Sequence, residues 1–429
     1  MAESSSQENK NEHLAVEIGK MFLEQEVQPT SECRIYKVPH HLRKWKEEAY
    51  TPQVISIGPY HHKSERLKNM EENKERYFKS FVHRSQMNRK NLVLNFVSTI
   101  RDLEKRIRGC YAATIELESD EFVKMILIDA SFILELFIKR TSRNWTSDDS
   151  MFNRPIAIAI MHDLLILENQ LPFFVLEKLY LVAFPSVSNA YPFHSSYHFL
   201  MKLTFEYFRR YNVQSIQAHP NVKIEHFTDL LRTFHLPLPE KLPNRDREPI
   251  IHLYSATHLH QAGVKFEVEY RNCLDIKFEK GVLKIPHFEL DDWKEVVIRN
   301  IMALEQTRYI ENGYISDYYF VLDLLINTKR DVELLSDKKV ITNYLGDSTA
   351  IKSVINSLNK GITGVKMRAG YDDLCKDLNK FYENRWHNWQ ATLRRQYFST
   401  PWRTTSTIVA FILLVLTCIQ AASSIIQVV

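Results

Sequence analysis

Outside its C-terminus, the most apolar segment of the chain is PIAIAIMHDLLILENQLPFFVLEKLYLVAF, which begins at Pro155 and ends at Phe184. Proline is favoured in the first turn of a helix, so Pro155 predicts a helix start. Apolar side chains would surround this helix on almost every side, and a helix of that kind is normally buried. Pro172 divides it into two segments. We therefore expect residues 155–184 to lie at the centre of the core.

The rest of the chain indicates a mainly α fold. The 429 residues include only 10 glycines, which favours helices over a turn-rich sandwich. Apolar residues three or four positions apart predict further helices over residues 14–25, 67–81, 92–107, 119–136, 196–211, 224–235, 292–304, 314–328, 331–345, 347–359 and 371–398. The segments VKFEVEY, LDIKFE and VLKIP alternate polar and apolar residues. The expected fold is therefore a large helical body with a small antiparallel sheet insert, in the α+β sense.

Composition divides the chain into three parts. Residues 1–13 are polar and are expected to be disordered. They contain no apolar run, so no cleaved signal peptide is predicted. Residues 14–400 form the helical body, in which the proline-rich segment 236–249 is a possible linker. Residues 408–429 carry no charged side chain and are expected to form a C-terminal transmembrane anchor.

The length of this apolar C-terminus fits one crossing of a bilayer. As a helix, residues 408–426 span roughly 28 Å, close to the about 30 Å of a hydrocarbon core. A buried C-terminal helix is the alternative, because Gln420, Ser423 and Ser424 are polar. The residues before the anchor are aromatic or basic, as is typical of a membrane interface. These residues are Trp386, Trp389, Arg394, Arg395, Tyr397, Phe398, Trp402 and Arg403.

The same flank predicts the side of the membrane on which the body lies. Positive charge before the anchor and none after it favours a cytosolic body, by the positive-inside rule. Five scattered cysteines without a CxxC pair read as reduced thiols, which also favours the cytosol. A glycosylation sequon at Asn144 points the other way. We expect a single-pass protein of the plasma membrane with a cytosolic body.

Four blocks of sequence resemble a plant family known as domain of unknown function 247. They are YKVPHHLRKWKEEAYTPQVISIGPYHH with LKNMEENKERYF, HDLLILENQLPFFVLEKLY, ATHLHQAGVKF with LDIKFEKGVLKIP, and NIMALEQ through YFSTPW. The resemblance runs from about residue 33 to the C-terminus. Within these blocks we expect a structural motif of Pro39, Tyr50, Pro52, Gly58, Pro59, Tyr60, His61, Glu71, Lys74, Glu168, Asn169, Gln170 and Pro172.

What the resemblance implies is a plant membrane protein with one C-terminal span and no established catalytic activity. Some grass members of the family are associated with self-incompatibility at pollination, and others with development or stress. The resemblance names neither a cofactor nor a partner. It therefore favours a signalling role without identifying the ligand.

Three carboxylates lie inside apolar helical segments, namely Asp129, Asp163 and Glu168. Burial is costly for an unpaired carboxylate and raises its pKa, so Asp163 is a candidate general acid or base beside His162. The side chains of adjacent helical residues diverge by about 100°, which argues against a joint catalytic site of His162 and Asp163. The alternative is that residues 168–170 satisfy backbone groups freed where Pro172 breaks the helix. Nucleophile motifs and phosphate-binding loops are absent from the sequence.

Histidine pairs are weak metal candidates, and no metal or other cofactor is predicted. His40-His41 and His61-His62 could each offer one ligand, since neighbours in extended chain point to opposite faces. A further pair at i, i+4, formed by His194 and His198, lacks the glutamate of a HExxH site.

The basic run 84–108 is interrupted by Asp102 and Glu104. It therefore reads as a solvated helix face, and no nucleic-acid partner is expected. A lipid-surface role for this run is a weaker alternative.

The sequence favours a non-enzymatic, membrane-anchored protein that contacts the lipid bilayer through its C-terminal helix and recognises a protein or peptide partner. The alternative is a membrane-tethered enzyme, such as a hydrolase, that uses His162, Asp163 or Glu168. Polar groups clustered in a concave pocket would favour the enzyme. The same groups buried and paired would favour the binding protein.

Overall fold

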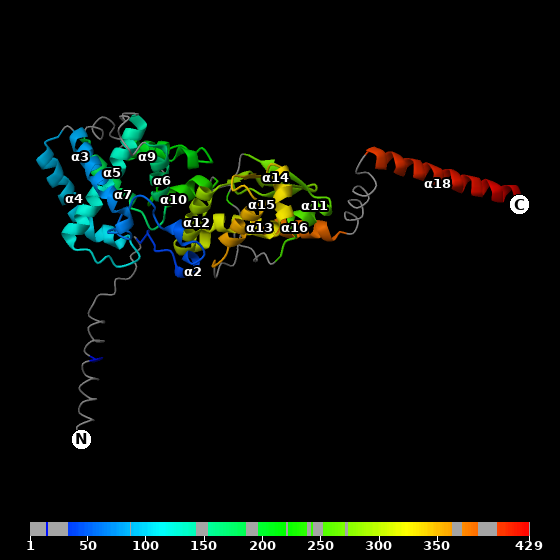
Figure 1. The fold of residues 1–429 in the computed structure, drawn as a ribbon, viewed down its shortest axis with the longest axis horizontal. Coiled ribbons are helices and arrows are strands. Elements are labelled where there is room, and N and C mark those ends of the chain that lie inside the picture. Colours follow the sequence, from blue (N-terminus) through cyan, green and yellow to red (C-terminus); the bar gives the residue numbers. More distant parts are fainter. Residues whose placement is uncertain are drawn as a thin grey trace, which may run out of the picture.

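The structure is a computed structural model that describes residues 14–15, 33–85, 87–142, 153–185, 196–219, 222–237, 242, 252–270, 273–362, 371–384 and 401–428. Helices dominate it, as predicted (Figure 1). The α-helices are α2 (His40–Arg43), α3 (Glu71–Arg84), α4 (Arg89–Gly109), α5 (Ser119–Ser142), α6 (Arg154–Asp163), α7 (Phe173–Ala183), α9 (Ser196–Tyr207), α10 (Phe227–His235), α11 (Ala256–Gln261), α12 (Asp292–Thr307), α13 (Tyr314–Leu325), α14 (Lys329–Asp337), α15 (Ser348–Leu358), α16 (Asp372–Glu383) and α18 (Pro401–Val428).

Short 3₁₀ turns complete the helical part, at η1 (Glu47–Tyr50), η2 (Glu65–Met70), η4 (Arg209–Tyr211) and η6 (Ile310–Asn312). The first two flank the extended block between α2 and α3, where prolines prevent a continuous helix.

Helix α5 is the most enclosed element of the N-terminal half. It packs against α3, α4, α7 and α9, and its buried side chains include Phe132, Ile133 and Phe137. Asp120 and Glu121 lie in its first turn, where the helix dipole favours acidic groups. Helix α4 packs against the same core through Phe96 and Ile100 near its middle, so its apolar stripe is the one predicted.

Residues 160–176 of the central segment are almost all buried as expected, whereas Pro155 is exposed and residues 156–159 are only partly buried. The helix also ends earlier than predicted. Helix α6 stops at Asp163, and residues 164–172 turn before α7 begins at Phe173. The turn is almost entirely buried. Its backbone is not hydrogen-bonded as a helix, because side chains of the segment take over those bonds. The polar network that does this is described below.

The predicted sheet exists, but the expectation of an antiparallel insert is wrong in part. Strands β1 (Lys265–Glu269), β2 (Lys277–Glu279) and β3 (Val282–Pro286) lie in the order β1-β3-β2. Strands β2 and β3 are antiparallel, whereas β1 and β3 are parallel. The chain runs up β1, down β2 and up β3, so the first and third strands point the same way. Since β3 lies between the other two, its pairing with β1 has to be parallel.

A second small sheet replaces the end of a predicted helix. Helix α14 ends at Asp337, and β5 (Ile341–Asn343) follows it and pairs in parallel with β4 (Phe288–Leu290). Ile341 and Thr342 are β-branched, which favours a strand over a helix. Periodicity alone did not reveal this change.

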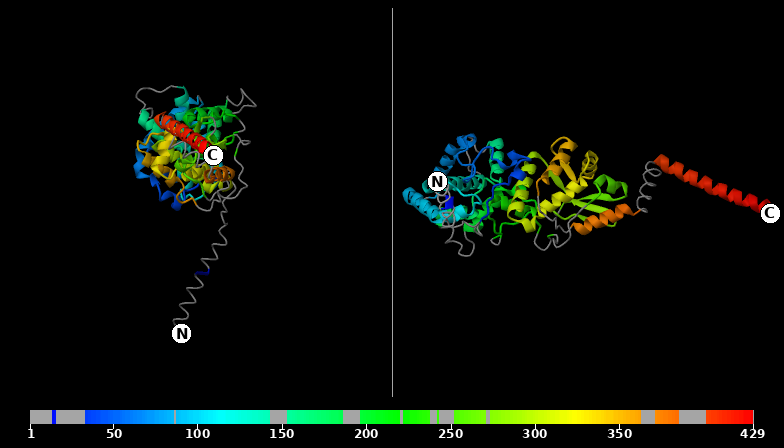
Figure 2. Two further views of the ribbon diagram at one scale, coloured as in Figure 1. Left: turned by 90° about the vertical axis from the view of Figure 1, so that its right-hand side faces the viewer. Right: turned by 90° about the horizontal axis from the view of Figure 1, so that it is seen from below.

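The described body has one large apolar core and one smaller apolar cluster. Its largest apolar cluster includes residues from α3 to α16, and a smaller cluster beneath α2 joins Leu42, Tyr50, Leu167 and Leu304. Figures 1 and 2 show α3 to α10 at one end of the body, and α11 and α13 to α16 with the sheets at the other. Helix α12 lies between these ends and contacts both α10 and α13. The small cluster therefore connects α2 to α12.

The expectation of a C-terminal transmembrane helix is wrong. Among the helices that the structure describes, none combines the length and the apolar character needed to cross a membrane. Helix α18 begins with the polar run Thr404–Thr407 and contains Gln420, which leaves a shorter apolar run between them. A span needs about 20 predominantly apolar residues. This finding also overturns the predicted single-pass location at the plasma membrane.

Several predictions fall on residues outside the described ranges. They concern the disordered segment 1–13, most of the possible linker 236–249, Asn144, His194, and the interface residues Trp386, Trp389, Arg394, Arg395, Tyr397 and Phe398. The side chains of His198 and Arg403 are also outside them. Trp402 is described and lies exposed at the start of α18.

Candidate functional site

Polar residues of the sequence blocks HDLLILENQLPFFVLEKLY and LKNMEENKERYF meet around residues 53–58, which we call the threaded segment. Residues 55–58 of this segment are buried, Gln53 is exposed, and none of its residues joins a sheet. The carboxylate of Asp163, at the end of α6, accepts hydrogen bonds from the backbone N–H groups of Gln53, Val54 and Ile55 at 2.8, 2.6 and 2.8 Å. One side chain thus replaces part of a neighbouring strand.

Asn169 continues this pairing further along the threaded segment. Its Oδ1 accepts from the Ile57 N–H at 2.7 Å. Its Nδ2 donates to the carbonyl oxygens of Ile55 and Asp163 at 3.0 and 2.9 Å. The amide therefore joins the threaded segment to the last turn of α6. An unpaired buried backbone group costs about 1–3 kcal/mol, so each of these bonds matters to stability.

Gln170 satisfies the backbone that is left free after α6. Its Nε2 donates to the carbonyl oxygens of Leu164 and Ile166 at 2.7 and 2.8 Å. Its Oε1 accepts from the N–H of Phe227, at the start of α10, at 2.8 Å. This is the role predicted for the polar residues before Pro172. It explains why the chain can turn inside the core.

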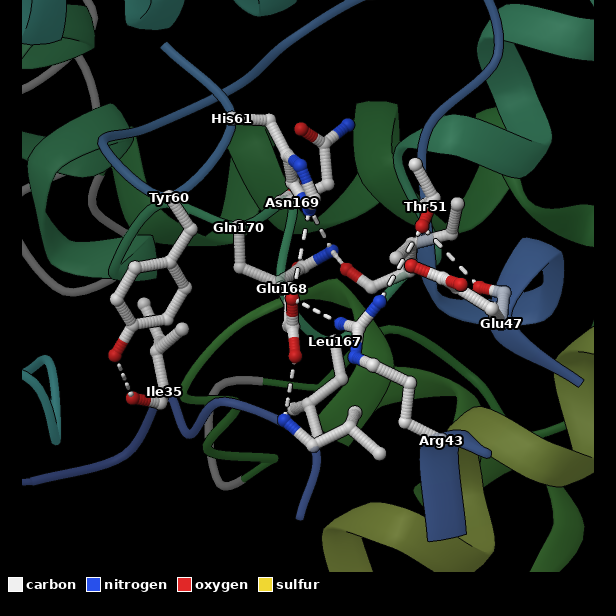
Figure 3. Close-up of polar contacts among 12 residues, drawn as sticks. Ile35, Arg43, Glu47, Thr51, Tyr60, His61, Leu167, Glu168, Asn169 and Gln170 are labelled. Atoms are coloured by element: carbon white, nitrogen blue, oxygen red, sulfur yellow. Dashed lines mark hydrogen bonds and ion pairs between the residues drawn. The ribbon is translucent and has the colours of Figure 1, made fainter. Parts of the chain in front are cut away.

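Glu168 binds the block that precedes the threaded segment. Its Oε1 accepts from the Val38 N–H at 2.5 Å, and its Oε2 lies 2.5 Å from Arg43 Nη2 and 3.6 Å from His61 Nε2 (Figure 3). Burial by itself would raise the pKa of Glu168. The donors around the carboxylate, His61 and Arg43 first, outweigh burial and hold that pKa below its ordinary value. Glu168 is thus an anionic anchor for α2.

A buried ion pair closes the other side of the threaded segment. Lys74 of α3 donates from Nζ to Asp129 Oδ1 at 2.7 Å and to the Ser56 carbonyl oxygen at 3.0 Å, and it lies 2.7 Å from Glu71. Burial would lower the pKa of Lys74, but the carboxylates of Asp129 and Glu71 outweigh it and raise that pKa. Lys74 therefore stays charged although it is fully buried.

Gly58 is the one position of the segment where a side chain could not fit. Its φ is +72°, and an added Cβ would lie 2.6 Å from the Gln170 carbonyl oxygen. Its N–H donates to Asp129 Oδ2 at 2.9 Å. The hydroxyl of Tyr111 donates to the same Gln170 oxygen at 3.0 Å. Glycine is required here by both conformation and space.

The remaining residues of the expected structural motif frame this network. Pro39 and Pro172 precede α2 and α7, where proline suits the start of a helix. Pro52 and Tyr50 are buried, and Pro59 is partly buried. Tyr60 donates from its hydroxyl to the Ile35 carbonyl oxygen at 3.2 Å. These groups fix the entry and exit of the threaded segment.

The three candidate catalytic residues do not form a joint site. His162 stacks on Trp293 at 3.9 Å between ring centroids, while Asp163 points to the threaded segment. Neither ring nitrogen of His162 has a hydrogen-bond partner among the described residues. Burial lowers the pKa of His162 to about 4, and burial raises the pKa of Asp163 to about 6 against the pull of three N–H groups. Glu168 binds Arg43 instead.

Two cavities formed by described residues of the N-terminal half do not include any of these three residues. One has a volume of about 350 Å³ and lies beside the threaded segment; it is lined by Ser56, His62, Lys63, Ser64, Glu65, Lys68 and Glu71. The other has a volume of about 390 Å³ and is lined by Met87, Asn95, Ser98, Thr99, Leu181, Val182 and Pro185. The second lining contains no acid or base.

The basic run at residues 84–108 is largely engaged within the protein. Arg84 binds the buried carboxylate of Glu135 through two nitrogens at 2.9 and 2.7 Å. Arg101 lies 2.6 Å from Asp120, and Arg108 pairs with Glu104 at 2.8 Å. These contacts favour a structural role over a lipid or nucleic-acid surface.

The histidines of the predicted pairs do not converge on a common site. His61 lies against Glu168, and His62 lies 3.5 Å from Glu121. His40 and His41 lie on the surface of α2. In the part of the chain that the structure describes, no cluster of three potential metal ligands occurs.

Asn300 and Arg43 also belong to the polar network, but neither was among the residues predicted from the sequence. Asn300 of α12 accepts from the Leu167 N–H at 2.9 Å and donates to the Ala49 carbonyl oxygen at 2.7 Å. It lies on the apolar face that carries Val297 and Leu304. A polar residue at a buried helical position is the signal that could have identified it. Nothing in the local pattern distinguishes Arg43 from its basic neighbours.

Comparison with known proteins identifies the same family that the sequence blocks of this network resemble. A family model described as plant protein of unknown function, DUF247, matches residues 35–416. The UPF0481 protein At3g47200 of Arabidopsis thaliana is 27% identical over 426 residues, which cover 92% of this chain and 87% of the relative. The putative UPF0481 protein At3g02645 of the same plant is 22% identical, with 91% and 89% covered. No solved structure matches the chain.

Proposed function

Because the chain belongs to the plant family DUF247, whose function is unknown, we propose a role from the site itself. The protein is a non-enzymatic binding protein whose helical body recognises a protein or peptide partner, in a signalling role. One observation carries this proposal. Asp163, Glu168 and the amides beside them are buried and use their polar atoms on the protein's own backbone and on Arg43.

The burial and internal pairing of Asp163 and Glu168 argue against a catalytic role for them. A general acid or base must come within hydrogen-bond distance of the substrate. Asp163 is 2% exposed, and its two oxygens already accept three N–H groups. A substrate would have to displace the threaded segment to reach it. A buried and satisfied network instead gives a rigid body, and a rigid body suits recognition at its surface.

The same argument predicts how substitutions in the network behave. Glu168→Ala removes the partner of Arg43 and of the Val38 N–H, so folding yield should fall. Thermal unfolding of the purified variant measures the loss. A variant of full stability that had lost only an activity would contradict the structural role of Glu168.

The proposal is tested by direct binding. Proteins cross-linked to the full chain in plant tissue are identified, purified and titrated against it by calorimetry. The expected result is saturable binding with a Kd of about 10 μM or tighter, unchanged in a Ser98→Ala control. Turnover of an ester, peptide or phosphoester by the purified chain would contradict the proposal, if Asp163→Asn abolished that turnover without lowering the unfolding temperature.

A further inference from the structure

The basic residues between positions 43 and 46, at the end of α2, direct some of their charges toward the core and others toward solvent. Arg43 and Lys46 point inward, where they pair with Glu168 at 2.5 Å and with Glu295 at 3.1 Å. Both carboxylates are buried. These two ion pairs hold the short helix against the core. The residues between them, Lys44 and Trp45, therefore have a fixed base from which they face solvent.

Trp45 has two ammonium groups near one exposed ring. Its side chain is 44% exposed. Lys44 Nζ lies 5.3 Å and Lys360 Nζ lies 4.8 Å from the ring centroid. Each contact is a cation–π interaction, which favours a cation over the indole face. Two cations that share one ring also repel one another, and an anion placed between them would remove that repulsion.

The charge of these two lysines is not neutralised nearby. Neither Lys44 nor Lys360 has a carboxylate within ion-pair distance in the described part of the chain. Asp323 lies close enough to Lys360 to feel its charge, but this carboxylate is hydrogen-bonded to Asn356. The surface thus carries two cations that are available to a partner.

Lys360 reaches Trp45 because the chain after α15 packs on α2. Gly361 has a φ of +83°, and a Cβ there would collide with the carbonyl oxygen of His41. This close backbone approach needs glycine. Ile362 also packs against the small apolar cluster beneath α2. The meeting of Lys360 and Trp45 is therefore built into the fold, although the two residues are far apart in sequence.

We infer that Trp45, Lys44 and Lys360 form a docking surface for an acidic peptide segment of the partner. This inference rests on the proposed binding function and names the chemistry of its ligand. Acidic side chains would meet the two ammonium groups, and the peptide would lie across the indole ring. Tryptophan is enriched at the energetically dominant centres of interfaces, which suits the position of Trp45 in this arrangement.

A peptide suits the surface better than a nucleic acid does. Glu47 and Glu48 are the first two residues of η1, and both are exposed. A continuous phosphate backbone would be repelled there, whereas a short acidic stretch can end before them. No arginine fork is available either, since Arg43 is used on Glu168, and lysine acts as a point charge.

The test measures fluorescence anisotropy of a labelled glutamate-serine peptide, with a lysine-serine peptide as the comparison. The full chain should bind the acidic peptide, and affinity should fall as salt rises from about 50 to 200 mM. The double variant Lys44→Glu/Lys360→Glu should weaken binding at least about tenfold, and Trp45→Ala at least about threefold. All three side chains are exposed, so folding should be retained, and circular dichroism checks this.

A matched control separates a local site from overall charge. Lys284→Glu/Lys338→Glu makes the same charge change at exposed positions on β3 and after α14, and it should leave affinity within about twofold. Equal loss in both double variants would overturn the inference, as would absence of binding by the parent chain. Binding of oligothymidylate is measured in the same way. The assignment of a peptide ligand would be overturned if oligothymidylate bound as tightly as the acidic peptide and lost that binding in Lys44→Glu/Lys360→Glu. A partner that still binds Lys44→Glu/Lys360→Glu would preserve the proposed function while rejecting this surface.

Discussion

The threaded segment and strand β3 both contribute buried residues to the core, but their backbones are held by different kinds of partner. The N–H and carbonyl groups of β3 pair with the backbones of β1 and β2. Those of residues 53–58 pair with the side chains of Asp163, Asn169, Asp129 and Lys74. The two segments therefore differ in the origin of their stability.

This difference teaches where substitutions should matter. In a ladder, the hydrogen bonds survive any side-chain change that preserves the strand. In the threaded segment, each bond depends on one particular side chain about 70 to 110 positions away, except at Lys74. Loss of that side chain leaves buried groups unpaired, which costs free energy. The four predictions below test this contrast.

The largest effect is expected when the buried ion pair of the threaded segment is broken. Asp129→Ala leaves the Lys74 ammonium buried and the Gly58 N–H unpaired, so the free energy of unfolding should fall by about 3–5 kcal/mol. Urea unfolding followed by circular dichroism measures it. As the matched control, Lys277→Ala removes an exposed ion pair with Asp275 beside the sheet and should cost at most about 1 kcal/mol. Similar losses in both variants would contradict the contrast.

A pH dependence is expected next. Burial raises the pKa of Asp163 to about 6, above its unfolded value of about 3.9. The folded state therefore binds more protons between about pH 4 and pH 6, and the stability from this group is lost as pH rises through that window. The loss amounts to about 3 kcal/mol. Urea unfolding of the parent and of Asp163→Asn should show their stability difference narrowing from pH 4 to pH 7. A constant difference would refute this assignment.

Two glycines with positive φ give a finer comparison. Gly58→Ala places a Cβ 2.6 Å from the Gln170 oxygen, whereas Gly281→Ala in the β2–β3 turn places it 3.5 Å from Phe381. Both variants adopt a strained φ, which costs about 1–2 kcal/mol. The clash should make Gly58→Ala less stable than Gly281→Ala by about a further 2 kcal/mol. Thermal unfolding of the two variants tests this prediction. Equal unfolding temperatures would contradict it, because they would show that the core around Gly58 rearranges to accept a methyl group.

The parts of this fold that the sequence predicted are those with local causes. Helices α4, α5 and α12 follow from apolar spacing and from capping residues such as Asp291, which accepts from the Lys294 N–H at 2.6 Å. Gln170 was foreseen as a backbone partner because Pro172 lies beside it. The turn of Lys280 and Gly281, both with positive φ, is equally local.

The parts that could not be predicted depend on contacts between distant residues. The parallel pairing of β1 with β3 depends on which strand lies in the middle. The partners of Glu168 and Asn169 lie about 110 to 130 positions away. The apolar C-terminus looked long enough for a membrane span, yet no described helix meets that requirement. Local pattern carries no information on such pairings.

Hydrogen exchange tests the central claim most directly, which is that side chains hold the threaded segment as a ladder holds a strand. Exchange of the backbone amides of residues 53–58 and 282–286 is measured at pH 7 in the parent chain and in Asp163→Asn. The account predicts comparable protection of both segments in the parent. In the variant, Gln53, Val54 and Ile55 should lose protection while β3 keeps it. Fast exchange of these three amides in the parent chain, or unchanged protection in Asp163→Asn, would contradict the account.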